Sequence, residues 1–447
     1  MIIAKFGGTS VSSKDRISAI CEIVKSQQDK DPIVVVSALS GVTDLLLSLP
    51  NLPRYKCLSE LKRLKNLHLD LINRVFTIKQ FQKDVTEFIN EKIKELSQLK
   101  LENHKKTSDR ISSFGEIMSS YIIAKALEQK GINSVPVVAT NLIITDENFT
   151  SAEFLIGPTK TNIKKILSPI VKNKIVPVVT GFIGATKQGE ITTLGRGGSD
   201  YSASIIGFCL GAKEIQIWTD VDGIFTADPR LVKKARPLPV VSFREAAELA
   251  TFGAKVLHPR TIHPAVKIGI PVRVLNTFNP KAVGTLIVEK SKGDKIIKAI
   301  SSKSGISLVN IYSTEMLLQK GFLAKIFTIF TRYNISIDLV TVSEVSVSVT
   351  LDNKDNLDKA VLELSKFSNV TISGNLSMVS LIGEGITDSH HHIKKIFDIL
   401  DDQKILPKMV SLGATNINIS LIVKADQVEK AVKVLHSRLL QKKSAKL

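Results

Sequence analysis

The sequence predicts a large α/β domain followed by two small α+β modules, and three observations lead to this fold class. Up to about residue 290, short β-branched runs alternate with helical patterns, as in a mainly parallel sheet covered by helices on both faces. The polar stretch SKGDK, from Ser291 to Lys295, then interrupts the alternation and reads as a linker. Beyond it a pattern recurs at a spacing of 70 residues, which indicates an internal repeat.

The first domain is predicted to span residues 1–292. Its buried strands are expected in the short apolar runs IIAKF, DPIVVVSAL, INSVPVVA, KIVPVVTGFIG, EIQIWTD and IPVRVLN. Lys14–Lys25, Glu116–Lys130 and Tyr201–Leu210 have helical patterns. Residues from about 55 to 105 are charged and helical in pattern without strand signals, so we interpret them as a helical excursion from the sheet.

The repeat predicts two modules of the ferredoxin-like type, at residues 300–374 and 375–447. The tripeptide KIF at Lys325 recurs at Lys395, and hydrophobic positions that follow it recur at the same spacing. Each copy reads strand, helix, strand, strand, helix, and the first copy also suggests a closing strand near Val370.

The composition argues against several classes of function. Lys and Arg number 61 against 42 Asp and Glu, but they are spread along the chain and aromatic residues make up only 5%, so no nucleic-acid partner is predicted. The three cysteines form no CxxC pair, which disfavours disulfides and a zinc site. No apolar run approaches the ~18 residues of a membrane span, and MIIAKFGGTS lacks the features of a signal peptide. A cytoplasmic protein is expected.

The glycine loop after the first strand is a candidate phosphate site. In KFGGTS, Lys5 lies at the end of a strand, and Gly7 and Gly8 make a tight loop before a helix. Free backbone N–H groups and a helix N-terminus attract phosphate oxygens, and Lys5 adds positive charge. The spacing of a Walker loop is absent, and a Gly-Gly turn after a strand is more often only a turn.

Two further segments carry polar side chains at positions that suit a small substrate. In SALSGVTDLL, Thr43 and Asp44 follow a buried strand, where open α/β sheets bind ligands, although a helix cap explains them equally well. In SSFGEIMSS, Glu116 follows a glycine at the expected start of a helix. It is either a cap favoured by the helix dipole or a carboxylate that holds a substrate ammonium.

The stretch TTLGRGGSDYSA places opposite charges on a glycine loop. Arg196 and Ser199 at a helix start suit a carboxylate or phosphate, whereas Asp200 would repel that anion unless it has another partner. Lys5 is available from another loop at the same edge of the sheet. We therefore expect Asp200 to orient Lys5 for work on a phosphoryl group.

WTDVDGIFTADPR follows the strand EIQI and carries three aspartates around a glycine turn without the spacing of an EF-hand. Thr219, Asp220 and Arg230 suit nucleotide contacts, and Lys255 in FGAKVLHP supplies a second cation for phosphates. The run His390–His392 is interpreted as a solvated helix start rather than a metal site, because adjacent positions do not share a helix face.

Taken together, these segments resemble the aspartate kinase (aspartokinase) family. KFGGTSV, SALSGVTDLL, FGEIMSS, TTLGRGGSDYSA, WTDVDGIFTADPR and ATFGAKVLHP occur in this order, and the repeats look like the tandem ACT domains of that family. The resemblance covers essentially the whole chain and implies an amino-acid-kinase fold followed by two ACT domains. It also implies ATP-dependent phosphorylation of L-aspartate to 4-phospho-L-aspartate, which begins the route to lysine, diaminopimelate, threonine and methionine.

The resemblance implies roles for individual residues of the kinase domain. Lys5 and Asp200 would be catalytic. Aspartate would be held by Thr43, Glu116 at the amino group, Arg196 at the α-carboxylate, and Ser199. The nucleotide site would comprise Lys5, Phe6, Gly7, Gly8, Thr219, Asp220, Phe225, Arg230 and Lys255, with Phe225 where the family often has Tyr. Mg²⁺ would arrive with ATP rather than on protein side chains. The attacking carboxylate is already ionised, so no general base is needed.

The chain most resembles the monofunctional, lysine-inhibited type, whose ACT domains bind the effector at a dimer interface. A homodimer or higher homo-oligomer is therefore implied. The matching effector positions are Met316, Gln319, Phe322, Leu323, Ser336, Ile337, Asp338, Ser343 and Glu344, with Asp338 taking the lysine ammonium. Gln319 replaces a usual serine and Val342 a usual threonine, and each change removes a hydroxyl.

Two other functions are disfavoured by features of the sequence. Another amino-acid-kinase relative, acting on glutamate, carbamate or a nucleotide, is disfavoured by the tandem repeats and by the FGEIMSS and TFGAKVLHP segments. A non-catalytic amino-acid sensor would be signalled by loss of Lys5 or Asp200, and both residues are present.

Overall fold

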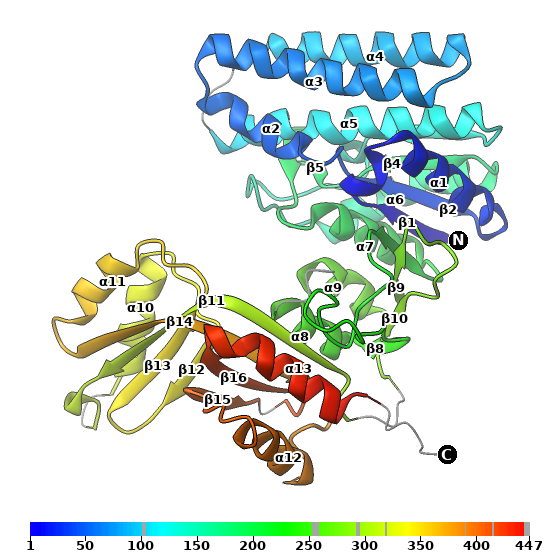
Figure 1. The fold of residues 1–447 in the computed structure, drawn as a ribbon. Coiled ribbons are helices and arrows are strands. Elements are labelled where there is room, and N and C mark those ends of the chain that lie inside the picture. Colours follow the sequence, from blue (N-terminus) through cyan, green and yellow to red (C-terminus); the bar gives the residue numbers. More distant parts are fainter. Residues whose placement is uncertain are drawn as a thin grey trace, which may run out of the picture. The chain divides into compact units, whose positions relative to one another are not determined.

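The structure is a computed structural model that describes residues 1–100, 104–252, 259–291, 296–317, 320–388, 390–413 and 415–441 (Figure 1). The chain divides into two compact units. The first contains the described residues of 1–224, 239–243 and 256–291, and the second contains those of 225–238, 244–255 and 292–447. Within the described residues, no helix has both the length and the apolar character needed to cross a bilayer.

The first unit is built on an eight-stranded sheet with the strand order β3-β4-β2-β1-β7-β9-β10-β8. Neighbouring strands pair in parallel, except that β10 is antiparallel to β9. β1 and β2 lie in the middle of the sheet and are almost wholly buried, which explains their β-branched composition. The strands are β1 (Ile2–Phe6), β2 (Pro32–Val36), β3 (Ser134–Val137), β4 (Val176–Thr180), β7 (Ile215–Thr219), β8 (Val240–Ser242), β9 (Val272–Asn276) and β10 (Thr285–Val288).

Helices cover both faces of this sheet (Figure 1). On one face, α1, α2 and α5 share a core with alternate residues of β1, β2 and β4. On the other face, α7 packs against β1, β2 and β7 and contacts α6 and α9. The helices are α1 (Lys14–Lys25), α2 (Val42–Ser48), α5 (Lys105–Gln129), α6 (Ile156–Lys172), α7 (Gly198–Leu210) and α9 (Pro259–Lys267), whereas α8 (Phe243–Thr251) belongs almost entirely to the second unit. A small hairpin of β5 (Ile183–Ala185) and β6 (Ile191–Thr193) precedes α7.

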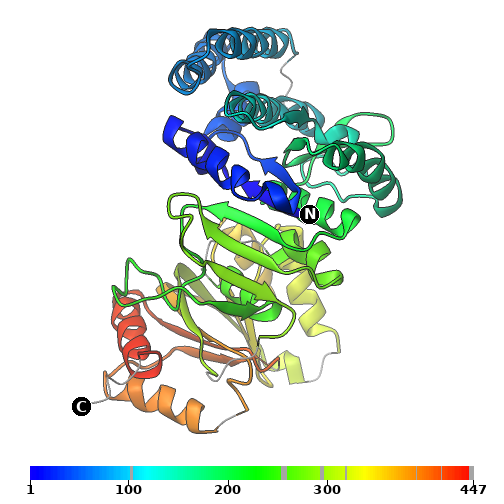
Figure 2. The same cartoon turned by 90° about the vertical axis from the view of Figure 1, so that its right-hand side faces the viewer.

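The region predicted as a helical excursion contains two long helices, α3 (Arg54–Val75) and α4 (Lys79–Ser97). They pack against each other, and α4 packs on α5. Both views show the pair on the side of α5 that faces away from the sheet (Figures 1 and 2). Their buried side chains join the core of the first unit, so the excursion is an added helical layer over α5.

The second unit contains a six-stranded antiparallel sheet in the order β12-β13-β11-β14-β16-β15. Helices α10 and α11 pack over one half of the sheet, and α12 and α13 over the other. The elements are β11 (Ala299–Tyr312), α10 (Phe322–Arg332), β12 (Leu339–Val342), β13 (Ser346–Leu351), α11 (Leu357–Leu364), β14 (Asn369–Ile382), α12 (His390–Asp401), β15 (Met409–Leu412), β16 (Asn418–Lys424) and α13 (Val428–Leu439). The predicted fold class, an α/β domain with two ferredoxin-like repeats, is confirmed.

The two repeats share the long central strands β11 and β14. Residues 307–312 of β11 pair with β13 of the first repeat, whereas residues 376–382 of β14 pair with β16 of the second. β11 and β14 pair with each other along their whole lengths, with register shifts near Ile306. The predicted boundary between residues 374 and 375 falls inside β14, and the domain limits stay predictions.

Candidate active site

A cavity of about 670 Å³ lies at the carboxyl edge of the first unit's sheet. Its walls come from the end of β1, the loop after β2, α5, and the start of α7, which is where open α/β sheets place their ligands. The lining includes all the residues predicted to be catalytic or to bind aspartate: Lys5, Thr43, Glu116, Arg196, Ser199 and Asp200. A larger hollow, of about 1050 Å³, lies between α1 and α3 and contains none of them.

Lys5 and Asp200 form an ion pair in this cavity. The Lys5 Nζ atom lies 2.6 Å from Asp200 Oδ1, and both side chains are 12% exposed. Lys5 is brought there by β1, and Asp200 by the first turn of α7. Gly197 precedes that turn with φ +70°, a conformation that suits glycine, so the chain can reverse into the helix next to the lysine. The expected contact between these residues is present, while their catalytic roles stay predictions.

The glycine loop after β1 runs close to the loop after β2. A Cβ atom on Gly8 would lie 2.7 Å from the carbonyl oxygen of Ala38, so only glycine fits there without a shift. Gly7 leaves space beside Lys5 Nζ, which would be 3.7 Å from a Cβ at that position. The ring of Phe6 is buried and stacks on Trp218 with 5.9 Å between ring centroids, so Phe6 can offer a nucleotide only its backbone.

The prediction that Glu116 begins a helix was wrong, because it lies in the middle of the 25-residue helix α5. The preceding Gly115 serves close packing instead: a Cβ there would lie 2.7 Å from that of Ala38. Glu116 is buried, its Oε1 accepts a hydrogen bond from the backbone N–H of Ala38 at 3.1 Å, and its Oε2 has no partner among the described residues. Burial raises the pKa of Glu116 to about 8. Such a carboxylate needs a donor, and an ammonium group would supply one.

The other predicted aspartate ligands also line the cavity. Thr43 lies in the first turn of α2, whose N-cap is Gly41, so neither Thr43 nor Asp44 caps that helix. Arg196 is exposed, and its guanidinium makes no hydrogen bond or ion pair with the residues that the structure describes. Ser199 is buried in the first turn of α7. The cavity therefore offers a cation with free donors and a buried carboxylate with a free acceptor.

Asp109 is a further buried residue of the cavity, and it is not among the site residues predicted from the sequence. It lies on α5 and accepts three hydrogen bonds from Thr150 and Thr193. The available signal was its spacing of seven residues, two helical turns, from Glu116, which puts both carboxylates on one helix face.

The predicted nucleotide residues that the structure describes fall in both units. Thr219 ends β7, next to β1 in the sheet, and its hydroxyl donates to Asp220 at 3.2 Å. Phe225 and Arg230 belong to the second unit, where Arg230 pairs with Asp228 at 2.7 Å. Lys255 lies outside the described residues.

The predicted effector residues belong to the second unit, around η5 (Thr314–Leu317), the start of α10 and the strand β12. Asp338 is partly buried and already has a cationic partner: Lys303 Nζ lies 3.0 Å from its Oδ1 and 2.8 Å from Asp352 Oδ2. Burial raises the pKa of Asp338, and Lys303 opposes that rise. Gln319 lies outside the described residues. The other predicted positions are Met316, Phe322, Leu323, Ser336, Ile337, Ser343 and Glu344, of which Phe322 is buried in the repeat core.

Comparison with known proteins gives consistent results over the whole chain. Residues 1–276 match the amino acid kinase family, and residues 379–439 match an ACT domain. The chain is 38% identical to aspartokinase 3, chloroplastic, of Arabidopsis thaliana, covering 98% of this chain and 81% of that protein. It is 34% identical to lysine-sensitive aspartokinase 3 of Escherichia coli, covering 99% of both.

Solved structures agree with these relatives. E. coli aspartokinase III in complex with aspartate and ADP (R-state) matches with a TM-score of 0.82 and 34% identity, covering 99% of this chain and all of that one. The same enzyme in complex with lysine and aspartate (T-state) matches with a TM-score of 0.84 and 33% identity, with the same coverage.

Proposed function

Because this chain belongs to the aspartokinase family, we propose that it transfers the γ-phosphoryl group of ATP to the side-chain carboxylate of L-aspartate. The products are 4-phospho-L-aspartate and ADP. The observation that carries the proposal is that one cavity holds the Lys5–Asp200 pair together with Glu116 and Arg196. This reaction would begin the route to lysine, diaminopimelate, threonine and methionine.

The cavity suits a reaction that depends on alignment and charge neutralisation. The attacking carboxylate is ionised at neutral pH, so phosphoryl transfer needs no general base. Lys5 would neutralise charge that develops on the transferring group, and Asp200 would hold its ammonium in place. The backbone of Gly7 and Gly8 approaches the same point from the end of β1. Thr219, Asp220, Phe225, Arg230 and Lys255 are assigned to the nucleotide.

Aspartate would be recognised by its three charged groups. Its ammonium would meet the unpaired Oε2 of Glu116, and its α-carboxylate would meet Arg196, with Thr43 and Ser199 as further hydroxyl contacts. These contacts would leave the side-chain carboxylate directed at Lys5. A substrate longer by one methylene group would place its carboxylate differently, which is the basis for discrimination against glutamate.

We propose that Mg²⁺ binds to this protein together with the nucleotide. Within the described residues, no three His, Cys, Asp or Glu side chains are grouped closely enough to hold a metal ion by themselves. Mg²⁺ commonly keeps several waters and binds through phosphate oxygens and one or two carboxylates. When bound, it would neutralise phosphate charge near Lys5, whose partner in the cavity is the Asp200 carboxylate.

An acceptor assay tests the proposed reaction. The purified protein is incubated with ATP, Mg²⁺ and hydroxylamine, and acyl hydroxamate is measured with L-aspartate, with L-glutamate and without an acceptor. We expect ATP-dependent product with L-aspartate alone. Product with L-glutamate alone, or no product with either amino acid, would refute the proposal.

We further propose that L-lysine inhibits the enzyme through the second unit. Two observations on this chain support the proposal. Asp338 offers a partly buried carboxylate to an ammonium, and β12 is an edge strand on which Val340 and Val342 are exposed. An exposed apolar edge strand favours pairing with another chain, so we propose a homo-oligomer formed through the ACT repeats. Titration of activity with lysine, threonine and methionine, together with light scattering, tests both points; inhibition by threonine or methionine but not lysine would overturn the choice of effector.

A further inference from the structure

Asp109 is a buried carboxylate in the wall of the substrate cavity. Its side chain is 1% exposed, and it points from the same face of α5 as Glu116. Burial raises the pKa of Asp109, and hydrogen bonds to the carboxylate oppose that rise. A carboxylate is retained in such a place only when donors satisfy its oxygens, so its partners indicate what it does.

Those partners come from two separate segments. Asp109 Oδ2 accepts hydrogen bonds from the backbone N–H groups of Thr150 at 2.8 Å and Thr193 at 2.9 Å. Its Oδ1 accepts one from the hydroxyl of Thr193 at 2.7 Å. The N–H of Ala152 also donates to the carbonyl oxygen of Thr193 at 2.9 Å. Asp109 therefore links the loop of residues 146–153 to the end of β6 through hydrogen bonds.

The end of β6, to which Asp109 is hydrogen-bonded, lies directly before the loop that carries Arg196. Thr193 is the last residue of β6, and Gly195 follows with φ +78°. A Cβ on Gly195 would lie 3.3 Å from the carbonyl oxygen of Thr150, so the two segments are in close contact there. Thr150 itself has φ +73°, which is unusual for a β-branched residue and requires support from its surroundings.

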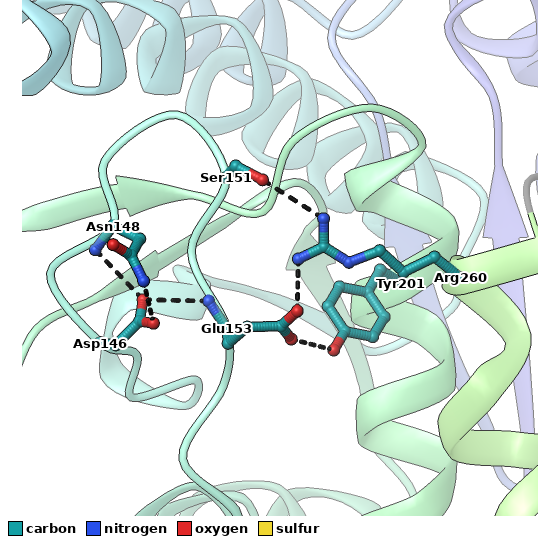
Figure 3. A network of polar contacts seen from close by, with 6 residues as sticks. All are labelled: Asp146, Asn148, Ser151, Glu153, Tyr201 and Arg260. Atoms are coloured by element: carbon teal, nitrogen blue, oxygen red, sulfur yellow. Dashed lines mark hydrogen bonds and ion pairs between the residues drawn. The ribbon is translucent and has the colours of Figure 1, made fainter. Parts of the chain in front are cut away.

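The other side of the 146–153 loop is anchored separately (Figure 3). Arg260 of α9 donates to Glu153 at 2.6 Å and to Ser151 at 3.2 Å, and the hydroxyl of Tyr201 on α7 donates to Glu153 at 2.9 Å. These contacts tie the body of the loop to α7 and α9. On the cavity side, next to the Arg196 loop, Asp109 is the side-chain anchor beside the backbone bond between Ala152 and Thr193.

We propose that Asp109 is a positioning residue, which holds β6 and the 146–153 loop so that Arg196 presents its guanidinium to the substrate's α-carboxylate. The proposal rests on the proposed function, in which Arg196 binds that group. Three donors already engage the two oxygens of Asp109, so it is assigned no contact with the substrate itself. Its effect is expected on aspartate affinity rather than on ATP affinity.

Four variants separate positioning from general stability. Asp109→Ala removes the anchor. Asp109→Asn can keep it, because the amide oxygen can accept both N–H groups while the amide nitrogen donates to the Thr193 hydroxyl, whose proton can rotate away. Thr193→Val removes one hydrogen bond and is the milder test if Asp109→Ala does not fold. Thr192→Val is the matched control, because the Thr192 hydroxyl is equally buried but bonds to Thr145 at 2.7 Å.

Steady-state kinetics with each substrate varied, together with melting temperatures, give the readout. We expect Asp109→Ala to raise KM for L-aspartate by roughly ten- to a hundredfold, as misplacement of a binding group does. Thr193→Val should act in the same direction but less, and KM for ATP should stay within about twofold of wild type in both. Asp109→Asn should restore KM for aspartate nearly to wild type, and Thr192→Val should lower only the melting temperature.

Three outcomes would overturn the proposal: unchanged KM for aspartate in both Asp109→Ala and Thr193→Val, equal increases in both KM values, or an Asp109→Asn variant as impaired as Asp109→Ala. Wild-type protein is assayed first. Its failure to phosphorylate aspartate would count against the proposed function, whereas a working wild type with unaffected variants counts only against the role of Asp109.

Discussion

The Lys5 ammonium lies 2.6 Å from the Asp200 carboxylate, and this contact joins the end of a central strand to the first turn of α7. Both side chains are largely buried, so removal of one leaves the other charge poorly compensated. The pair is therefore expected to matter for position as well as for charge.

Lys5→Met and Asp200→Asn are each expected to lower kcat by about 10²- to 10³-fold or more, the usual effect of removing a group that stabilises the transition state. Far-UV circular dichroism should be unchanged. Lys174→Met is the matched control, because Lys174 and Asp31 form a pair of the same 2.6 Å length whose lysine is 73% exposed. Turnover close to wild type in either cavity variant would contradict the assigned role.

Because the pKa of Glu116 is raised, we expect kcat/KM for L-aspartate to depend on pH. Its pKa of about 8 in the free enzyme means that the carboxylate needed for the substrate ammonium is largely protonated at pH 6 and 7. Thus kcat/KM for L-aspartate should rise with pH and level off above about 8. With saturating aspartate, kcat/KM for ATP should lack this step, and Glu116→Gln should abolish it while raising KM for aspartate. A flat profile in wild type would count against the contact.

Glu116 should also make the stability of the ligand-free protein depend on pH. A higher pH should favour substrate binding by Glu116 but lower the free energy of unfolding. The folded-state pKa of Glu116 lies above the ordinary 4.5, so ionisation of the buried group costs stability, increasingly from pH 4.5 to about 8. Glu116→Gln removes that cost. The ligand-free variant should therefore melt at a higher temperature than wild type above pH 8, and the difference should shrink towards pH 4.5. A lower melting temperature at pH 8.5 would contradict this and show that the carboxylate has donors in the free protein beyond the N–H of Ala38.

Gly8 tests the closeness of the two loops at the sheet edge. Gly8→Ala places a Cβ 2.7 Å from the Ala38 carbonyl oxygen, so the glycine loop must move, at a cost of roughly 1–3 kcal/mol. We expect kcat/KM for ATP to fall. Gly157→Ala is the control, because none of the described residues lies within 4 Å of its added Cβ and Gly157, in the first turn of α6, has no positive φ. Equal values of kcat/KM for ATP in the two variants would show that the Gly8 loop does not approach the nucleotide.

Lys303 tests the proposed effector site. An incoming lysine ammonium would have to compete with Lys303 for the Asp338 carboxylate. Lys303→Met should therefore lower the lysine concentration that gives half inhibition by roughly three- to tenfold, for a pair worth about 1 kcal/mol. Lys354→Met, an exposed change in the same repeat, should have no effect. Weaker inhibition in Lys303→Met would show instead that Lys303 assists the effector.

His68 predicts acid sensitivity of the helical layer. It is fully buried in α3, its Nδ1 lies 2.8 Å from the Leu64 carbonyl oxygen, and its Nε2 has no partner in the part of the chain that the structure describes. Burial lowers its pKa from 6.5 to about 4, so the neutral ring stabilises the fold above pH 6.5, and that stability is lost as pH falls towards 4. The loss amounts to about 3 kcal/mol at most. Urea titrations at pH 7, 5.5 and 4.5 should show a shallower decline in His68→Leu than in wild type; equal declines would contradict this.

The sequence was informative where function depends on strand ends. Lys5 and Asp200 could be paired in advance because one ends a strand and the other opens a helix at the same sheet edge, and parallel strands bring such points together. Glu116 was recognised as a candidate ligand but misplaced, because Gly115 looks like a helix boundary. Glycine is needed at position 115 because Ala38, a residue distant in sequence, packs closely against it.

The spacing of Asp109 from Glu116 could place both carboxylates on one helix face, but the role of Asp109 depends on bonds to Thr150 and Thr193, which no local pattern links to it. The repeat of 70 residues correctly predicted two ferredoxin-like copies. It did not reveal that β11 and β14 each serve both copies, since a repeat in sequence records similarity and not which strands pair.

Shared strands make the duplicated region indivisible. A fragment that stops at residue 374 keeps residues 299–304 but loses residues 377–382, their partners in the sheet, and so exposes an unpaired edge prone to aggregation. A fragment that starts at residue 375 lacks the neighbouring strand on that side of β14. Truncation or recombination within the repeats is therefore expected to give insoluble products, and transplantation of the pair is expected to succeed only when it includes residues 299–441 together.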